Sequence, residues 1–177
     1  MRKLTRLLAM LLMAFIASGC ATFNASSSYA PEASPNKGLV VFSFTASEEI
    51  QNFGLQYESA GTGSSQRGDV TFHTIQDPLD WTTPEKGRLV VMELPAGRYE
   101  FYRFIAPLRW MSERFSVPFF ATPGKVVYFG NLHVDVGGFR GSIRIDNMAS
   151  RDLPLLMSRY PRIKPGDITT TLFKVIH

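Results

Sequence analysis

The 177-residue sequence has few of the residues that make disulfides and metal sites: it contains one cysteine and three histidines. A single cysteine excludes an internal disulfide, so the folded state has to be stabilised by a buried core. Zinc sites need three or four clustered ligands, whereas only His73 and His133 lie within the body of the chain. We therefore expect no metal site and no cofactor.

Sequence motifs of common enzyme classes are also missing. No serine stands in a G-x-S-x-G elbow, which α/β-hydrolases use to expose their nucleophile. The sequence Pro123-Gly124-Lys125-Val126 lacks the upstream glycine and the final Ser or Thr of a phosphate-binding loop. These absences favour a protein that is not an enzyme.

No run of about 18 apolar residues occurs, so the sequence predicts no transmembrane helix. The N-terminus has a shorter pattern, in which Arg2, Lys3 and Arg6 precede ten apolar residues at 7–16 and small residues follow at 17–19. A positive region, a short apolar core and small residues are the three parts of a secretory signal peptide. We therefore predict a cleaved signal peptide over residues 1–19.

The sequence Ala17-Ser18-Gly19-Cys20 resembles the lipobox of bacterial lipoproteins, with alanine where leucine is commoner. The resemblance implies that the thiol of Cys20 receives diacylglycerol and that Cys20 becomes the acylated first residue after cleavage. Ala21 stands where an inner-membrane retention signal has aspartate, which implies sorting to the periplasmic face of the outer membrane in a Gram-negative host. Each buried acyl CH₂ contributes about 0.8 kcal/mol, so two or more chains hold a protein firmly on the membrane.

Signal cleavage also changes the charge of the protein. The full chain has 19 basic and 15 acidic residues, and three of the basic residues belong to the expected signal peptide. The remaining chain has 16 basic and 15 acidic residues, a net charge of +1. Nucleic-acid-binding domains have a marked basic excess, so we expect no nucleic-acid partner.

Two regions of different composition follow the signal peptide. Residues 20–37 are rich in Ser, Ala, Asn and Pro without apolar periodicity, which predicts a lipidated flexible tether. Residues 38–177 contain short β-branched and aromatic runs separated by Gly, Pro and Asp, which are typical of strands. About seven or eight such runs predict one all-β domain, an antiparallel β-sandwich. Asp152 as an N-cap and Pro161 as a stop predict one short C-terminal helix over residues 152–161.

Two runs show the alternation of strands most clearly. Leu39–Thr45 places Val40, Phe42 and Phe44 on one face. Lys125–Val136 also alternates, so we expect one set of its residues in the core and most of the other set in water. The first set is Val126, Tyr128, Leu132, Val134 and Val136, and the second is Val127, Phe129, Asn131, His133 and Asp135.

The sequence Leu94-Pro-Ala-Gly97-Arg-Tyr99 resembles the tyrosine corner of immunoglobulin-like and transthyretin-like sandwiches. The resemblance implies that the Tyr99 hydroxyl bonds to the backbone upstream and that Gly97 supplies an unusual backbone angle. With Pro123-Gly124-Lys125 and the run at 127–130, this strand is similar to the small β-sandwich lipoproteins of the DUF2846 type, over about residues 88–146. That similarity implies a sandwich fold and an envelope location, and no reaction.

Aromatic residues in turn-like sequences are the remaining candidates for a site. Trp81 and Trp110, the second with Arg109 and Arg114 nearby, are candidates for a partner-binding patch, because Trp and Arg often dominate interfaces. Alternatively, each Trp closes an open end of the sandwich. We expect an outer-membrane-anchored periplasmic lipoprotein that binds an envelope protein or glycan or has a structural role. A cell-wall hydrolase with an unrecognised site and a carrier of a small apolar ligand are the alternatives.

Overall fold

A computed structural model of the chain describes residues 24–46, 54–60, 67–71, 79–81, 86–106, 109–110, 115–137 and 140–176. The expected signal peptide, Cys20 and Arg114 lie outside these residues. Within the described residues, no helix is long and apolar enough to cross a membrane.

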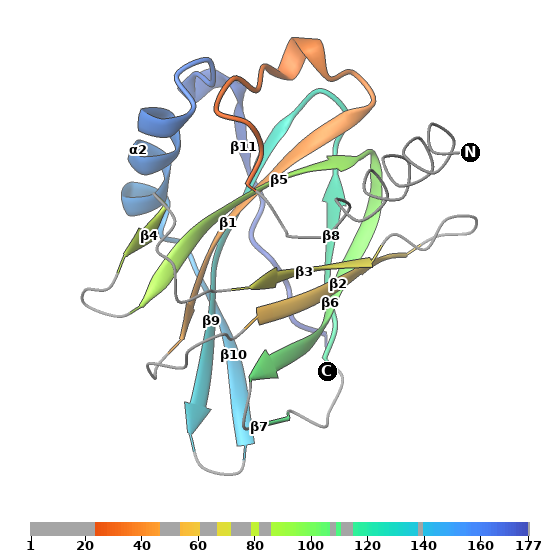
Figure 1. The fold of residues 1–177 in the computed structure, drawn as a ribbon, viewed down its shortest axis with the longest axis vertical. Coiled ribbons are helices and arrows are strands. Elements are labelled where there is room, and N and C mark those ends of the chain that lie inside the picture. The colour runs from red at the N-terminus through yellow and green to blue at the C-terminus, as the bar shows by residue number, and fades with distance from the viewer. Residues whose placement is uncertain are drawn as a thin grey trace, which may run out of the picture.

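Strands dominate the described chain, which has a single α-helix near its C-terminal end (Figure 1). In chain order the elements are η1 (Pro31–Ala33), β1 (Lys37–Ala46), β2 (Gly54–Ser59), β3 (Arg67–Thr71), β4 (Asp80–Trp81), β5 (Gly87–Pro95), β6 (Gly97–Ala106), β7 (Arg109–Trp110), β8 (Val117–Ala121), β9 (Val126–Gly137), β10 (Arg140–Asp146), α2 (Ala149–Arg159), η2 (Pro165–Asp167) and β11 (Ile168–Thr170).

The strands form two sheets. Sheet A has the order β10-β9-β1-β5-β4, and β11 also pairs with β9. Sheet B has the order β3-β2-β6-β7, and β8 also pairs with β6. The pairings of β9 with β1 and β11 are parallel, whereas the other pairings between described strands are antiparallel. The predicted all-β sandwich with one short helix is therefore confirmed, but sheet A is mixed rather than antiparallel, because β9 pairs in parallel with both β1 and β11.

The core between the sheets is rich in phenylalanine. Val40, Phe42 and Phe44 of β1 all face it and are fully buried, as the alternation predicts. Phe173 follows β11 and inserts among these rings, stacking on Phe129 with ring centroids 4.8 Å apart. Burial of each such side chain stabilises the fold by about 1.5–3 kcal/mol, so this cluster replaces the disulfides that the chain cannot form.

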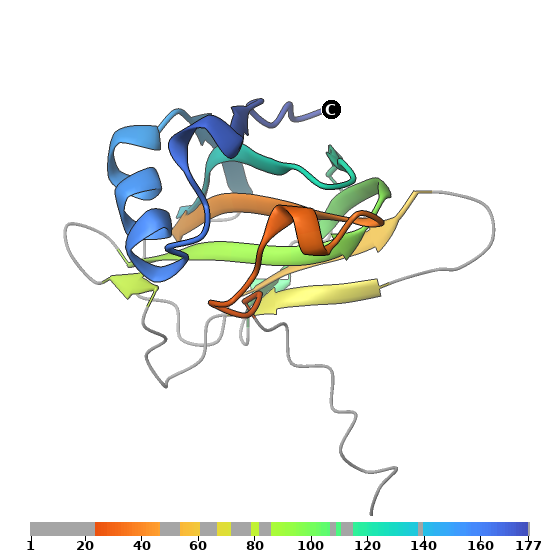
Figure 2. The same ribbon diagram turned by 90° about the horizontal axis from the view of Figure 1, so that it is seen from above.

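The other face of sheet A is covered by α2 and by residues 24–36. Leu39 and Val41 of β1 are buried there against Leu156 and Tyr160 of the helical region. Figure 2 shows α2 on one side of β1 and β5, and the β2–β3 pair on the other. Because both faces of β1 are covered, the strand is almost continuously apolar, which is typical of strands in a parallel pair.

The segment expected as a flexible tether is packed from Asn24 onward. The backbone N–H of Ala25 donates to the Val91 carbonyl at 2.7 Å, and the Val91 N–H donates to Asn24 Oδ1 at 2.9 Å. The Tyr160 hydroxyl donates to the Ala25 carbonyl at 2.8 Å, and Tyr29 is buried. Residues 24–36 therefore belong to the domain. The composition of the segment did not indicate this, because its residues are mostly small or polar and show no apolar periodicity.

The expected faces of the β9 run are wrong: Val127 and Phe129, expected on the face in water, are buried between the sheets, and the two faces exchange after Tyr128. Gly130 has φ of +90°, and the pairing with β1 shifts there, from Val41 opposite Tyr128 to Ser43 opposite Asn131. Two steps along β1 thus oppose three along β9, which is a β-bulge, and a bulge of one residue exchanges the two faces of a strand. Beyond it, Leu132 and Val134 enter the core between the sheets, whereas Asn131 and His133 lie buried under α2.

The helix begins three residues earlier than the sequence predicts. Its N-cap is Met148, whose backbone carbonyl accepts from the Asp152 N–H at 3.0 Å. Asp152 is therefore inside the first turn and fully buried, so its prediction as the N-cap is wrong. A carboxylate in the first turn still interacts favourably with the helix dipole.

Candidate functional site

Trp81, one of the four residues expected in a partner-binding patch, is a packed side chain. Its ring covers Gly87 so closely that a Cβ there would come within 2.3 Å of the indole. The guanidinium carbon of Arg151, from α2, lies 4.4 Å from the ring centroid, a cation–π contact. Trp81 packs against the apolar residues under α2, which is the position of an end cover rather than of a projecting loop residue.

Two other residues of the expected patch belong to a strand of the other sheet. Arg109 and Trp110 form β7, which pairs with β6 in sheet B, whereas Trp81 is in β4 of sheet A. Arg114 lies outside the described residues. The expected patch of four residues therefore stays a prediction.

Tyr99 makes the hydrogen bond of a tyrosine corner. Its hydroxyl donates to the Pro95 carbonyl at 2.9 Å, and the side chain is 2% exposed next to buried Leu94. Burial raises the pKa of Tyr99 above its ordinary value of 10.0, so the hydroxyl stays a donor at neutral pH. Gly97 has no positive φ, and a Cβ there would lie 3.8 Å from the Tyr99 ring, so the special backbone role expected for Gly97 is wrong.

Polar residues gather under α2 where the sequence predicted a solvated sheet face. We call this group the α2 cluster. Six of its members are buried and come from β1, β9 and α2, and Arg151 closes it towards Trp81. Its members are Ser43, Thr45, Tyr128, Asn131, His133, Arg151 and Asp152.

The Asp152 carboxylate is the centre of the α2 cluster. Its Oδ2 lies 2.6 Å from both the Ser43 Oγ and the Tyr128 hydroxyl, and its Oδ1 accepts from Arg151 Nε at 2.8 Å. Burial, together with the hydrogen bond to Asp152 and its charge, raises the pKa of Tyr128 far above 10.0. The tyrosine is therefore a permanent donor, and the cluster fixes α2 on sheet A through hydrogen bonds that are shielded from water.

Serine, histidine and aspartate occur together in the α2 cluster, but in the wrong arrangement for a catalytic triad. His133 Nδ1 lies 2.8 Å from the Thr45 hydroxyl, and Ser43 is directed to Asp152 and Asn131 instead. A triad needs the base on the nucleophile and the carboxylate on the base. Ser43 is also fully buried. Among the described residues no group of three or more His, Cys, Asp or Glu could hold a metal ion.

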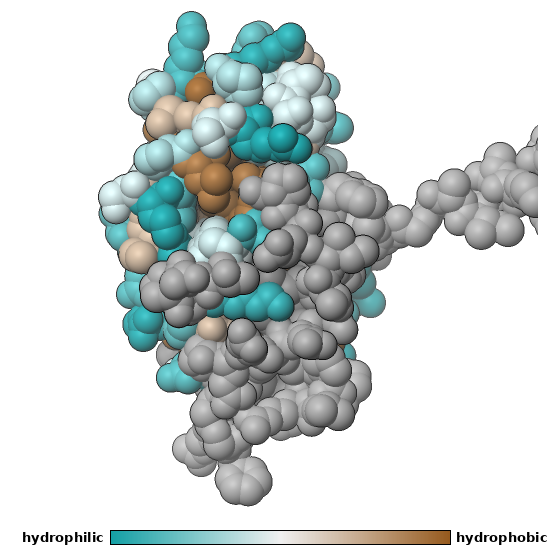
Figure 3. All heavy atoms as spheres, turned by 60° about the vertical axis from the view of Figure 1, so that its left-hand side comes forward, coloured by the Kyte–Doolittle hydropathy of each residue, from teal (hydrophilic) through white to brown (hydrophobic). Residues whose placement is uncertain are grey.

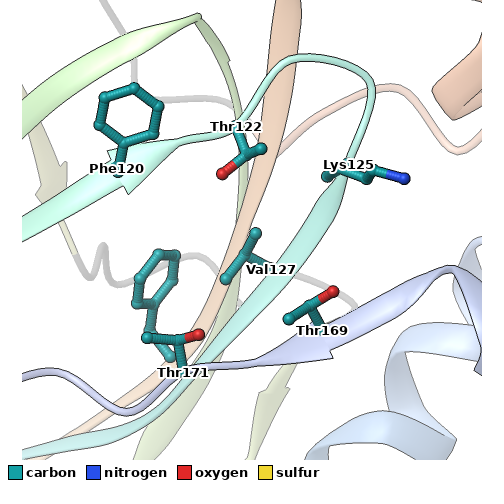
Figure 4. A pocket seen from close by; sticks show the side chains of 7 residues that line it. Phe120, Thr122, Lys125, Val127, Thr169 and Thr171 are labelled. Atoms are coloured by element: carbon teal, nitrogen blue, oxygen red, sulfur yellow. The ribbon is translucent and has the colours of Figure 1, made fainter.

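A groove opens on the edge of the sandwich between β8 and the C-terminal segment. We call it the edge groove; its volume is about 330 Å³. Its floor consists of side chains that also belong to the core between the sheets, and its rim carries hydroxyl groups and one ammonium group (Figure 4). It is lined by Phe120, Thr122, Lys125, Val127, Phe129, Thr169 and Thr171.

Three large hydrophobic residues are exposed in the described chain: Phe120 lines the edge groove, Ile176 pairs with Ser116 beside β8, and Leu172 lies next to Gly130 instead. Phe120 of β8 is 51% exposed, Ile176 is 52% exposed and Leu172 is 38% exposed. In contrast, the face seen in Figure 3, on the α2 side, shows only a small hydrophobic area between hydrophilic residues, next to atoms drawn in grey. The edge groove, with an exposed aromatic residue beside an apolar floor, is therefore a candidate binding site on the described surface.

Sequence reasoning missed Phe120 because an aromatic residue in a strand-like run is usually core. One signal was visible: residues 115–124 contain no charged side chain. Exposed edge strands normally carry charges that prevent association, so an uncharged edge indicates contact with something else. Recognising it required the knowledge that β8 is an edge strand.

Comparison with known proteins gives no family. No family model and no curated protein matches the chain. One solved structure with a similar arrangement is that of a proposed cell adhesion protein from Bacteroides fragilis, with 6% sequence identity and a TM-score of 0.39. The similarity covers 63% of this chain and 46% of that one, so the chain spans less than half of its length. At this level the similarity carries no function over to the chain.

Proposed function

We propose that the protein is a lipid-anchored binding module of the bacterial outer membrane, which holds an envelope protein at the edge groove. The observation that carries the proposal is Phe120, an aromatic side chain 51% exposed beside a groove that reaches the core. Aromatic anchors next to apolar pockets dominate the energetics of protein interfaces. The lipobox-like sequence at residues 17–20 supports the anchor.

The described surface supports binding better than catalysis. The buried polar groups that could carry chemistry are bonded to one another under α2, and their position fixes that helix. A small apolar ligand is the second candidate for the edge groove, because Val127 and Phe129 form an apolar floor. A protein partner is favoured because Phe120 and Ile176 extend the apolar surface beyond the groove.

The location is tested by fractionating cells that express the wild type or Cys20→Ser. We expect the wild type in the outer-membrane fraction and the variant either unprocessed or released. Unchanged processing and membrane retention of Cys20→Ser would contradict the lipid anchor.

Binding is tested with a photo-crosslinking amino acid at position 120, in intact envelopes. Position 150, an exposed serine of α2, is the matched control. We expect a reproducible protein adduct from position 120 and not from position 150. Equal labelling from both positions, or adducts with lipid alone, would refute a protein partner at the edge groove.

A further inference from the structure

The backbone of β8 has hydrogen-bonding groups that point away from sheet B. Phe120 stands opposite Arg98 of β6, and the Arg98 carbonyl accepts from the Ala60 N–H, on the β2 side, at 2.8 Å. Because Arg98 faces β2, the N–H and carbonyl of Phe120 have no partner in β6 and point outward.

Two further observations agree with this orientation. The Ser116 carbonyl, four residues before Phe120, accepts from the Ile176 N–H at 2.8 Å on the outer side of β8. Pro118, two residues before Phe120, has its backbone on the same side of the strand as Phe120. Because this side does not bond to β6, the missing N–H of proline breaks no hydrogen bond within sheet B. Among the described strands, only the bridge between Ser116 and Ile176 occupies this edge.

The two segments that border the edge groove carry no charge of their own, and Lys125, just before β9, is the one charged residue among the residues that line it. Residues 115–124 around β8 have no charged side chain, and neither do residues 168–173 of β11 and the segment after it. Natural edge strands are normally protected by lysine, by other charges or by covering elements. Pro118 gives some protection, but the Phe120 N–H and the carbonyls of Phe120 and Pro118 have no hydrogen-bond partner among the described residues.

We propose that the partner binds by strand addition: an extended, uncharged segment of another protein pairs with the outer edge of β8 and becomes a further strand of sheet B. It accepts a hydrogen bond from the Phe120 N–H and donates to the carbonyls of Phe120 and Pro118. Since side chains of a strand alternate, every second residue of the segment covers the floor at Val127 and Phe129. This inference rests on the proposed function and specifies its binding mode.

A protein segment fits the edge better than a second copy of this chain or a lipid does. A second β8 would bring Pro118, so it would lack one of the outward N–H groups that an ordinary strand provides. A lipid chain fills the apolar floor but leaves the outward backbone groups of Phe120 unpaired. Only an extended peptide can both cover the apolar floor of the edge groove and form hydrogen bonds with the outward backbone groups of β8.

The inference is tested by attaching a donor strand to the protein itself. The bridge between Ile176 and Ser116 brings the end of the chain beside β8. A linker of about ten Gly and Ser residues after His177, with a root-mean-square length of roughly 17–19 Å, reaches Phe120, about 14 Å further along the strand. The appended segment is Thr-Val-Thr-Val-Thr-Val-Thr, and the matched control replaces each Val by Pro.

We expect the donor strand to slow hydrogen exchange of the Phe120 amide at least about 10-fold and to raise the melting temperature by about 4 °C or more. The proline-containing control should do neither. Phe120→Pro removes the outward N–H without breaking a bond to β6, and it should abolish both the rise and the protection of the appended segment. Phe120→Ser keeps the N–H and should retain part of both effects.

Several results would overturn strand addition. These are an unprotected Phe120 amide in the donor-strand protein, or equal stabilisation of the wild type and Phe120→Pro. Self-association of the unmodified protein in sedimentation experiments, lost in Phe120→Pro, would assign the edge to a second copy instead. If crosslinking from position 120 persists while the donor strand has no effect, the protein binds a partner at the edge groove but not by strand addition. If the donor strand adds but no envelope protein is captured, the function falls.

Discussion

Replacing Asp152 by alanine should destabilise the domain far more than replacing an exposed aspartate. Asp152 is fully buried, and its carboxylate accepts hydrogen bonds from Ser43, Tyr128 and Arg151. After the change the Ser43 hydroxyl still has Asn131 Oδ1 at 2.9 Å, but the buried Tyr128 hydroxyl loses its acceptor. An orphaned buried donor costs about 1–3 kcal/mol, and breaking a buried ion pair costs about 3–5 kcal/mol.

Arg151 reduces this cost, because its side chain is 28% exposed and water can solvate it after the carboxylate is lost. We therefore expect Asp152→Ala to lower the free energy of unfolding by about 3–4 kcal/mol, measured by urea denaturation. Tyr128→Phe removes the orphaned donor, so the double variant should be less destabilised than the sum of the single changes by about 1–2 kcal/mol.

Asp146→Ala is the matched control. Asp146 accepts from Arg144 Nε at 2.8 Å, but both side chains are at the surface, with exposures of 36% and 63%. Exposed ion pairs contribute about 0–1 kcal/mol, so the control should change stability by no more than that. If Asp152→Ala cost no more than the control, or if the double variant were strictly additive, the account of the α2 cluster would be refuted.

Three further changes test separate features of the fold. Gly130→Ala should cost at least about 1 kcal/mol more than Gly124→Ala: both positions have positive φ, but only at Gly130 would the new Cβ meet a β10 carbonyl, at 2.8 Å. Equal costs in urea denaturation would argue against the bulge. Tyr99→Phe should cost about 1 kcal/mol by losing the bond to Pro95, and a neutral result would show that the corner does not stabilise the domain. Burial raises the pKa of Tyr128 above 10.0, so the neutral form is favoured in the folded state; its contribution is complete below pH 10 and is lost as the pH rises further. The free energy of unfolding should therefore fall above pH 10, and less steeply in Tyr128→Phe; identical slopes would contradict this.

The fold class could be predicted from the sequence because short β-branched and aromatic runs, separated by Gly, Pro and Asp, recur along residues 38–177. The two-residue repeat of a strand was enough to predict that Val40, Phe42 and Phe44 share one face, and that face lies in the core between the sheets. The faces of β9 could not be predicted, because a bulge at Gly130 exchanges them, and a single glycine in a strand run does not reveal a bulge by itself.

The candidate site was harder to predict from the sequence than the fold class. Asp152 looks like an N-cap until the helix start at Ala149 is known, and only then is it seen as the buried centre of a cluster. Phe120 looks like core until β8 is known to pair only with β6 among the described strands. In both cases the missing information is which segments become neighbours, and residue type does not determine that.

The attachment of Asn24 and Ala25 to β5 limits how far the domain can stand from a membrane. If Cys20 carries the lipid, four Cα steps separate it from Asn24, and a fully extended chain covers at most about 14 Å over that distance. The hydrocarbon core of a bilayer is about 30 Å thick, so the segment between Cys20 and Asn24 can span only about half of that thickness. The domain would therefore lie next to the lipid headgroups. A partner for the edge groove would then have to be sought among molecules at the same membrane surface.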